Sequence, residues 1–286
     1  MYQLLKLTEV PGLVHGMSEL WQGNQSFRYV RRPAEARAAR SVFRRYLEKL
    51  PGGYPLFMPG NGVAMRPAFN PPLLPTLEIR VARFHGDDRG CGMFTEEDEM
   101  RAEALVTQDR GLFFFLTVAD CLPVVLFDPV TRTLALAHVS RVTVILRLIK
   151  DHGEPVKAVP PLLSRLIDFL SLKYGVKAGD VIAAIGPGIS KESYELEWFD
   201  GAHRPEWKSF LAVGAAGRIR VDLAGFSRWL LESKGVLPEN IEVSGLDTVT
   251  ARDEEGILRF FSHRRAAMNG ETEGRNAFVV GMPLEE

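Results

Sequence analysis

A cysteine and a histidine lie at the outer ends of two short apolar segments. Cys121 begins the segment 121–127, and His138 ends the segment 133–138. Both segments have the length and composition of buried strands, so we predict an antiparallel hairpin. A two-residue loop at Pro129-Val130 would make the cysteine and the histidine direct cross-strand neighbours, about 5 Å apart at Cβ. A longer loop, which suits the proline better, would place them diagonally at about 7–8 Å. In either register a thiol and an imidazole meet at one end of the hairpin.

A second imidazole, that of His85, ends another predicted strand at 77–84. Two imidazoles and one thiolate form a good ligand set for zinc, and three protein ligands leave a fourth position open, as in catalytic zinc sites. Zinc at such a site lowers the pKa of water and supplies hydroxide near pH 7. Cys91, in a glycine-rich loop close to His85, is a candidate extra ligand. The alternative is that Cys121 is a small apolar core residue and the histidines are ordinary polar residues at strand ends.

Two other kinds of chemistry can be compared with zinc catalysis, namely cysteine hydrolysis and copper oxidation. Cys121 as nucleophile with His138 as base would make a cysteine hydrolase or amidase. A true multicopper laccase is disfavoured, because its copper cluster needs many histidines in His-x-His pairs. The six histidines here are scattered, so zinc is expected and copper is less favoured.

The hydrophobic patterning predicts an α/β (α+β) fold, a single domain over residues 1–286 with a mixed, largely antiparallel central sheet flanked by helices. Capping residues and apolar stripes predict helices at 33–50, 160–174, 206–213 and 222–234. Short apolar runs predict strands at 77–84, 104–107, 112–117, 122–127, 133–138, 181–185, 241–246, 258–261 and 277–281.

Composition narrows the classes of partner and compartment. The net charge of −1 gives no basic excess for nucleic acid or a membrane surface, so a small molecule is the expected partner. Two cysteines cannot build a disulfide framework, and the first residues lack a basic segment followed by a long apolar run. No apolar stretch is long enough to span a bilayer. We expect a cytoplasmic protein.

Ordered motifs along most of the chain resemble the YfiH-like, or laccase-domain, family of purine nucleoside phosphorylases. They are Phe84-His85-Gly86 (like QVHG), Ala119 to Val124 (ADCxPV), Ala137-His138 (the start of AHAGWRG), Gly186 to Ile189 (GPxIG) with Tyr194-Glu195, and Phe260 to Arg265 with Thr272 and Gly274-Arg275 (FFSYRR…TGR).

This resemblance implies a zinc site formed by His85, Cys121 and His138, which are spaced by 36 and 17 positions. It implies phosphorolysis of adenosine or inosine to the base and ribose 1-phosphate, with adenosine deamination as a second activity. It also implies a fold shared with bacterial toxins that carry a Cys/His deamidase site. The expected phosphate donors are the guanidinium groups of Arg264 and Arg265 and backbone N–H groups of the loop that contains Gly186 and Gly188.

The segment after His138 departs from the family pattern. HAGWRG here reads His138-Val139-Ser140-Arg141-Val142-Thr143, which moves the arginine one place towards the amino terminus. Elsewhere, Arg83 replaces the glutamine of QVHG, Ser193 replaces a cysteine, and Asp247-Thr248 replaces a cysteine-threonine pair. Arg141 can replace the family arginine only if the backbone shifts. A divergent member with altered substrate or little catalytic activity is therefore a further alternative.

Overall fold

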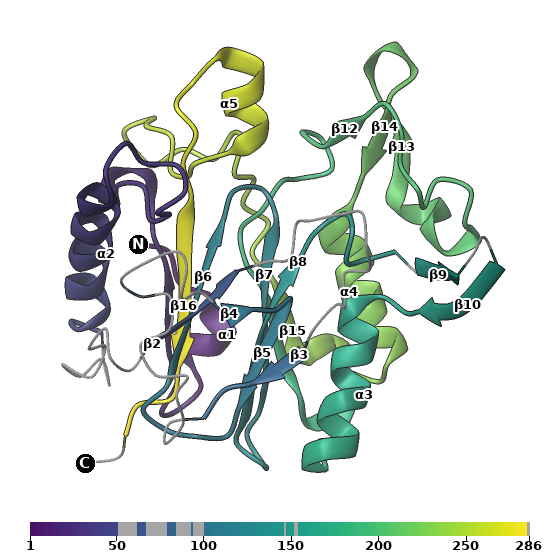
Figure 1. The fold of residues 1–286 in the computed structure, drawn as a ribbon, viewed down its shortest axis with the longest axis horizontal. Helices are drawn as coiled ribbons and strands as arrows, with labels where there is room; N and C mark the ends of the chain where they lie inside the picture. Colours follow the sequence, from purple (N-terminus) through teal and green to yellow (C-terminus); the bar gives the residue numbers. More distant parts are fainter. Residues whose placement is uncertain are drawn as a thin grey trace.

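Two packed β-sheets with helices on their outer faces make up the structure (Figure 1). The computed structural model describes residues 1–50, 62–66, 79–83, 93, 100–145, 147–151 and 154–284. The predicted ligand His85 and the candidate ligand Cys91 lie outside these residues. The fold class is mixed α/β, as the sequence predicts.

The larger sheet carries the predicted hairpin at its centre. Its order is β15-β11-β7-β8-β5-β3. The strands are β3 (Ile79–Val81), β5 (Ala104–Thr107), β7 (Leu122–Asp128), β8 (Thr133–Val139), β11 (Ile182–Ile185) and β15 (Ile241–Val243). The four central strands pair antiparallel, and the two edge strands join in parallel. Every residue of β7 and β8 is buried, because protein covers both faces of the sheet.

A four-residue loop, 129–132, joins β7 to β8 and sets their register. Pro123 pairs with His138, so Cys121 lies just before β7 and diagonal to His138. The Asp128 carboxylate accepts hydrogen bonds from the N–H groups of Val130 (3.0 Å) and Thr131 (3.2 Å) and from the Thr131 hydroxyl (2.6 Å). These bonds satisfy two backbone N–H groups of the loop. The longer-loop alternative is confirmed, and the two-residue loop is wrong.

The second sheet packs against the first through a shared apolar core. Its order is β1-β16-β6-β2-β4. The strands are β1 (Val14–Met17), β2 (Gly62–Arg66), β4 (Met100–Arg101), β6 (Phe113–Val118) and β16 (Asn276–Gly281). Alternate residues of β6 and β7, including Phe114, Leu116, Val125 and Phe127, belong to one buried cluster between the sheets. That cluster holds the two sheets together.

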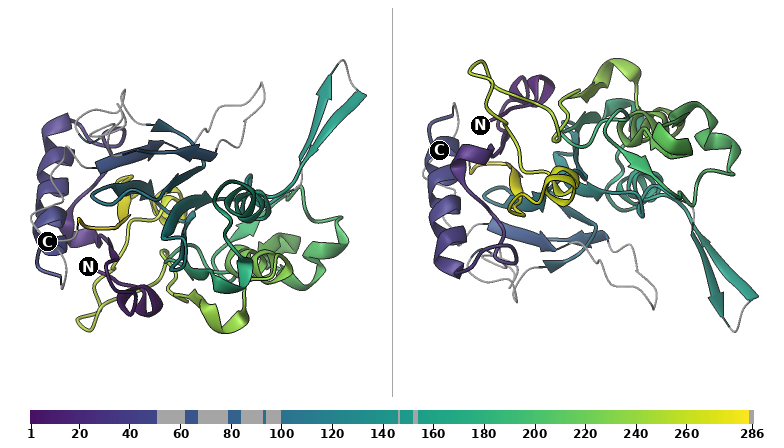
Figure 2. Two further views of the ribbon diagram at one scale, coloured as in Figure 1. Left: turned by 90° about the horizontal axis from the view of Figure 1, so that it is seen from below. Right: turned by 90° about the horizontal axis from the view of Figure 1, so that it is seen from above.

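Helices cover the two outer faces. Helix α2 (Pro33–Leu47) packs Phe43 and Leu47 against the outward residues of β6 and β16. Helices α3 (Leu162–Tyr174) and α4 (Leu223–Ser233) share a buried cluster with the outer face of the larger sheet. Figures 1 and 2 show the resulting order of layers, helix–sheet–sheet–helices. The predicted caps of α3 and α4 are confirmed, because Gly175 is left-handed and Asp222 accepts from Gly225 N–H.

Smaller elements complete the chain. They are α1 (Leu5–Thr8), α5 (His263–Asn269), the projecting hairpin β9 (Arg147–Asp151) and β10 (Glu154–Val159), and the three-stranded sheet β12 (Glu195–Leu196), β14 (Ile219–Val221) and β13 (Leu211–Val213) (Figure 2). The described residues also form short 3-10 helical segments, which are η1 (Leu20–Gln22), η3 (Ala178–Asp180), η4 (Pro205–Phe210), η5 (Ala215–Gly217) and η6 (Pro238–Asn240). None of the helices in the described part of the chain is long and apolar enough to cross a membrane.

Two sequence predictions of local structure differ from the structure. The helix predicted at 206–213 forms only as the 3-10 segment η4, and its last three residues are strand β13, because Leu211 pairs with Val221. The strand predicted at 258–261 does not form. There the Arg259 N–H donates to the carbonyl of Ala251, and the Phe261 N–H donates to the Asn276 side chain.

Candidate functional site

Cys121 lies just before the start of β7, and His138 lies near the end of β8. The two strands are antiparallel neighbours in the larger sheet, so the two residues are close to each other. The thiol is partly exposed, and its side chain hydrogen-bonds the buried imidazole. Behind the imidazole, Nδ1 of His138 hydrogen-bonds Oε2 of Glu103 at 2.8 Å. Glu103 immediately precedes β5, and its carbonyl accepts the N–H of His138 at 2.8 Å. The β5–β8 pairing therefore fixes both ends of this contact.

The surroundings of His138 favour its protonated form. Burial opposes protonation, but electrostatic interactions and hydrogen bonds with Cys121 and Glu103 outweigh it. Together they raise the pKa of His138 above its ordinary value. Because Glu103 engages Nδ1, the Nε2 atom of the same ring is left to face the thiol.

Asp120 holds the backbone just before the cysteine. It has a positive φ of 81°, which is uncommon for a residue other than glycine. Its buried carboxylate accepts hydrogen bonds from the Thr248 hydroxyl and from the Arg264 N–H, both at 2.7 Å. Its carbonyl accepts the N–H of Ile189 at 2.8 Å. Three separate segments therefore converge on the residue before Cys121.

The Gly186–Ser190 loop packs closely on this segment. The N–H groups of Gly186, Gly188 and Ile189 donate to the carbonyls of Pro123, Leu246 and Asp120, and the Ser190 N–H donates to Asp247. Pro187 has no N–H, so each donor of the loop already has an acceptor inside the protein. The N–H groups predicted to bind phosphate are therefore already hydrogen-bonded within the protein, where they position the chain.

The two glycines of the loop are required by close contact. A Cβ at Gly188 would lie 2.2 Å from a methyl group of Leu122 and 3.0 Å from the carbonyl oxygen of Asp120. A Cβ at Gly186 would lie 2.7 Å from the Pro123 ring. Glycine allows this loop to reach the start of β7.

The two arginines at the start of α5 have different surroundings. Arg265 is buried, and its guanidinium donates to Glu271 and to the carbonyls of Thr248, Val249 and Phe260. Arg264 instead donates one Nη2 bond to the carbonyl of Glu195, and its buried Nε has no hydrogen-bond partner among the described residues. Arg264 is therefore the better placed of the pair to bind an anion.

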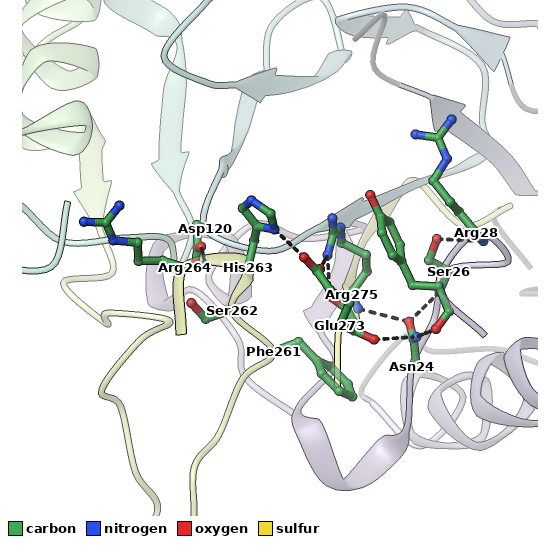
Figure 3. A network of polar contacts seen from close by, with 12 residues as sticks. Asn24, Ser26, Arg28, Asp120, Phe261, Ser262, His263, Arg264, Glu273 and Arg275 are labelled. Atoms are coloured by element: carbon green, nitrogen blue, oxygen red, sulfur yellow. Dashed lines mark hydrogen bonds and ion pairs between the residues drawn. The ribbon is translucent and has the colours of Figure 1, made fainter. Parts of the chain in front are cut away.

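Figure 3 shows Arg264 and His263 leaving the helix start in different directions. His263, which is exposed, pairs through Nδ1 with Glu273 at 2.5 Å. Glu273 also pairs with Arg275, whose guanidinium lies 3.8 Å from the centre of the Tyr29 ring. This network holds the carboxyl-terminal motif against residues 24–29.

Tyr194 and Arg141 lie on the side of the site that carries Cys121. Burial, followed by electrostatic interaction with Cys121 and Asp120, raises the pKa of Tyr194 to about 12, while Arg141 and Arg264 oppose that change. Four ionisable groups thus act on one phenol. Arg141 is exposed, in a turn closed by the Ser140 N–H, which donates to the Thr143 hydroxyl at 2.8 Å.

The donor set fits a metal ion at this site. A thiol and an imidazole converge, and a carboxylate orients the imidazole through its other nitrogen, as is usual for histidine ligands. In the described part of the chain no group of three or more histidine, cysteine, aspartate or glutamate residues comes together. The third predicted ligand, His85, falls outside that part.

Sequence reasoning did not single out Glu103, and it gave no role to Tyr194 or Asp120. Glu103 lies in an acidic stretch in which no residue is distinctive. The sequence places Glu103 only just before a predicted strand. Its role beside His138 can be inferred only once β5 is known to pair with β8.

Comparison of the sequence with known proteins identifies its family and several relatives. A family described as multi-copper polyphenol oxidoreductase laccase matches residues 76–283. The purine nucleoside phosphorylase YlmD of Bacillus subtilis is 28% identical over 212 residues, covering 72% of this chain and 68% of that protein. A purine nucleoside phosphorylase of Deinococcus radiodurans is 31% identical over 189 residues, covering 64% and 62%. An adenosine deaminase, RL5, from an unknown prokaryotic organism is 30% identical over 192 residues, covering 64% and 65%.

Solved structures share the fold. YlmD from Geobacillus stearothermophilus superposes with a TM-score of 0.74 at 20% identity, covering 96% of this chain and 93% of that chain. YfiH from Bacillus licheniformis gives 0.72 at 21% identity, covering 94% and 92%. The chain belongs to the family described as multi-copper polyphenol oxidoreductase laccase, the YfiH-like family that its motifs predict.

Proposed function

We propose that this chain is a zinc-dependent purine nucleoside phosphorylase. It would cleave adenosine or inosine with inorganic phosphate to the free base and ribose 1-phosphate. The observation that carries the proposal is the arrangement of Glu103, His138 and Cys121, an oriented imidazole beside a partly exposed thiol. Several relatives named purine nucleoside phosphorylase support the same reaction class.

Zinc would be held by Cys121, His138 and His85. Zinc in an open site of this kind acts as a Lewis acid and lowers the pKa of water. Glu103 holds His138 in the tautomer and orientation that ligation by Nε2 requires. These ligand roles rest on the donor types and, for His85, on the family motif.

Arg264 and Tyr194 would contact the substrates. The partly exposed guanidinium of Arg264, which makes one hydrogen bond to the Glu195 carbonyl, would give charge-assisted hydrogen bonds to a phosphate oxygen. The Tyr194 hydroxyl stays protonated at neutral pH because its pKa is raised to about 12, so it can donate to phosphate or to a purine nitrogen. Arg141, exposed nearby, would add positive charge for the incoming dianion.

Adenosine deamination is a second activity that the same site would support. Water replaces the exocyclic amine at C6 of the purine and ammonia leaves. A relative named adenosine deaminase, 30% identical to this chain, favours this addition.

A cysteine hydrolase or amidase is the second candidate, and one observation favours it. Cys121, His138 and Glu103 stand in the order nucleophile, base and orienting carboxylate. A divergent member with little catalytic activity is the third, because the changed segment Val139–Thr143 adjoins His138.

Metal analysis combined with nucleoside assays separates the three. We expect about one zinc per chain in protein purified without added metal, and phosphate-dependent release of base from adenosine or inosine. Cys121→Ala and His138→Ala should each lose both properties, whereas His203→Ala, at an exposed histidine, should keep them. Zinc-free protein that is rapidly alkylated at Cys121 would favour the cysteine hydrolase. Stoichiometric zinc without turnover of any nucleoside would favour the inactive member.

A further inference from the structure

Asp120 links the residue that presents the thiol to the helix that presents the arginine. One carboxylate oxygen accepts the Thr248 hydroxyl, and the other accepts the backbone N–H of Arg264 in the first turn of α5. Cys121 follows Asp120 directly in the chain, so this single side chain connects the backbone next to the thiol with the start of α5. Figure 3 shows Asp120 beside Arg264.

The backbone of Asp120 is held as firmly as its side chain. Its φ of 81° is a conformation that costs energy for most residues and that aspartate and asparagine tolerate best. The Ile189 N–H donates to its carbonyl, and Gly188 packs against the same oxygen. The surrounding segments therefore enforce the conformation.

Charged groups from both sides of this link act on Tyr194. The phenol experiences the charges of Cys121 and Asp120 from the start of β7 and that of Arg264 from α5. The guanidinium of Arg264 is further fixed by its bond to the carbonyl of Glu195, next to the same tyrosine. A small displacement of α5 would move this guanidinium relative to the thiol.

We propose that Asp120 is a positioning residue that fixes the Arg264 guanidinium relative to the Cys121–His138 pair, and so sets the phosphate affinity of the site. The inference rests on the proposed phosphorolysis for the identity of the anion. Asp120 itself binds neither the anion nor the nucleoside. It acts through the Arg264 N–H and through the backbone that it shares with Cys121.

The test compares variants that separate the two contacts of the carboxylate. Asp120→Asn retains a residue that tolerates positive φ, but its amide cannot accept from both Thr248 and Arg264. Thr248→Val removes one contact and keeps the side-chain shape, and Thr248→Ser restores the hydroxyl. Ser262→Ala is the matched control, because the Ser262 hydroxyl caps the same helix by accepting from Arg265 N–H without touching the residue before Cys121.

The readouts are binding of inorganic phosphate by calorimetry, the KM values for phosphate and inosine, and zinc content. Asp120→Asn should weaken phosphate binding and raise the phosphate KM about tenfold or more, the size expected for a lost charge-assisted hydrogen bond. The inosine KM and zinc content should stay within about twofold of wild type. Thr248→Val should have a smaller effect on phosphate, and Thr248→Ser and Ser262→Ala should resemble wild type in phosphate binding.

Three outcomes overturn the inference. The first is an Asp120→Asn protein that binds phosphate as wild type does. The second is a Ser262→Ala protein with an equal loss, which would show that Asp120 acts only as a helix cap. The third is a wild-type protein that binds no phosphate. Phosphate binding without turnover of any nucleoside would instead defeat the proposed function, while the comparison of variants still decides the role of Asp120.

Discussion

Glu103 is the residue whose charge orients the catalytic histidine of the proposed site. Replacing it with glutamine keeps a hydrogen-bond acceptor for Nδ1 of His138 but removes the negative charge behind the ring. We expect Glu103→Gln to lower zinc affinity or kcat/KM by about 10–100-fold, as changes behind a metal-bound histidine commonly do. Competition titration with a chelator and steady-state kinetics would measure both. Glu232→Gln, in a surface i,i+4 pair with Arg228, should change neither.

The contrast between Arg264 and Arg265 predicts two different phenotypes. Arg265→Ala leaves three buried or partly buried carbonyl groups without their donor, so unfolding free energy should fall by about 3 kcal/mol or more. Arg264→Ala should cost less stability and act mainly on the KM for phosphate. Urea denaturation and kinetics of both variants test this division, and equal stability losses with equal KM effects would contradict it.

At the scale of the element, the Gly186–Ser190 loop positions the start of β7. Gly188→Ala places a methyl group against Leu122 and the Asp120 carbonyl, so the loop must move away from Cys121. We expect a loss of about 1–3 kcal/mol in stability together with lower activity. Gly179→Ala is the matched control, since a Cβ there meets no atom within 4 Å. Thermal unfolding and nucleoside assays measure the two effects, and a Gly188→Ala protein indistinguishable from Gly179→Ala would refute this role for the loop.

At the scale of the whole molecule, one buried histidine makes stability depend on pH. Burial lowers the pKa of His15 to about 4, and Nε2 of the ring accepts the Leu4 N–H at 2.8 Å, which requires an unprotonated nitrogen. The unfolded chain binds a proton at His15 near pH 6.5 and the folded chain does not. Stability from this residue is therefore complete above about pH 6.5 and falls by up to about 3 kcal/mol as the pH drops towards 4.

His15→Gln isolates that contribution. The glutamine side chain can accept the Leu4 N–H and does not titrate, so its unfolding free energy should change less between pH 6.5 and pH 4.5 than that of wild type. Urea denaturation at several pH values measures the difference between the two proteins. If the unfolding free energies of the two proteins changed in parallel with pH, protonation of His15 would not contribute to the pH dependence of stability.

The sequence by itself determined the thiol–imidazole pair, the hairpin that carries it, the mixed sheet and the family. These follow from local features: apolar runs of strand length, caps such as Asp222 and Gly175, and an ordered series of motifs. Only the tertiary structure decided that Glu103 stands behind His138 and that Arg265 is structural while Arg264 has a free donor. It also decided that the glycine loop supports Asp120. The physical reason is that each of these depends on which distant strand or loop supplies the hydrogen-bond partner, and strand pairing across tens of residues leaves no periodic trace in the chain.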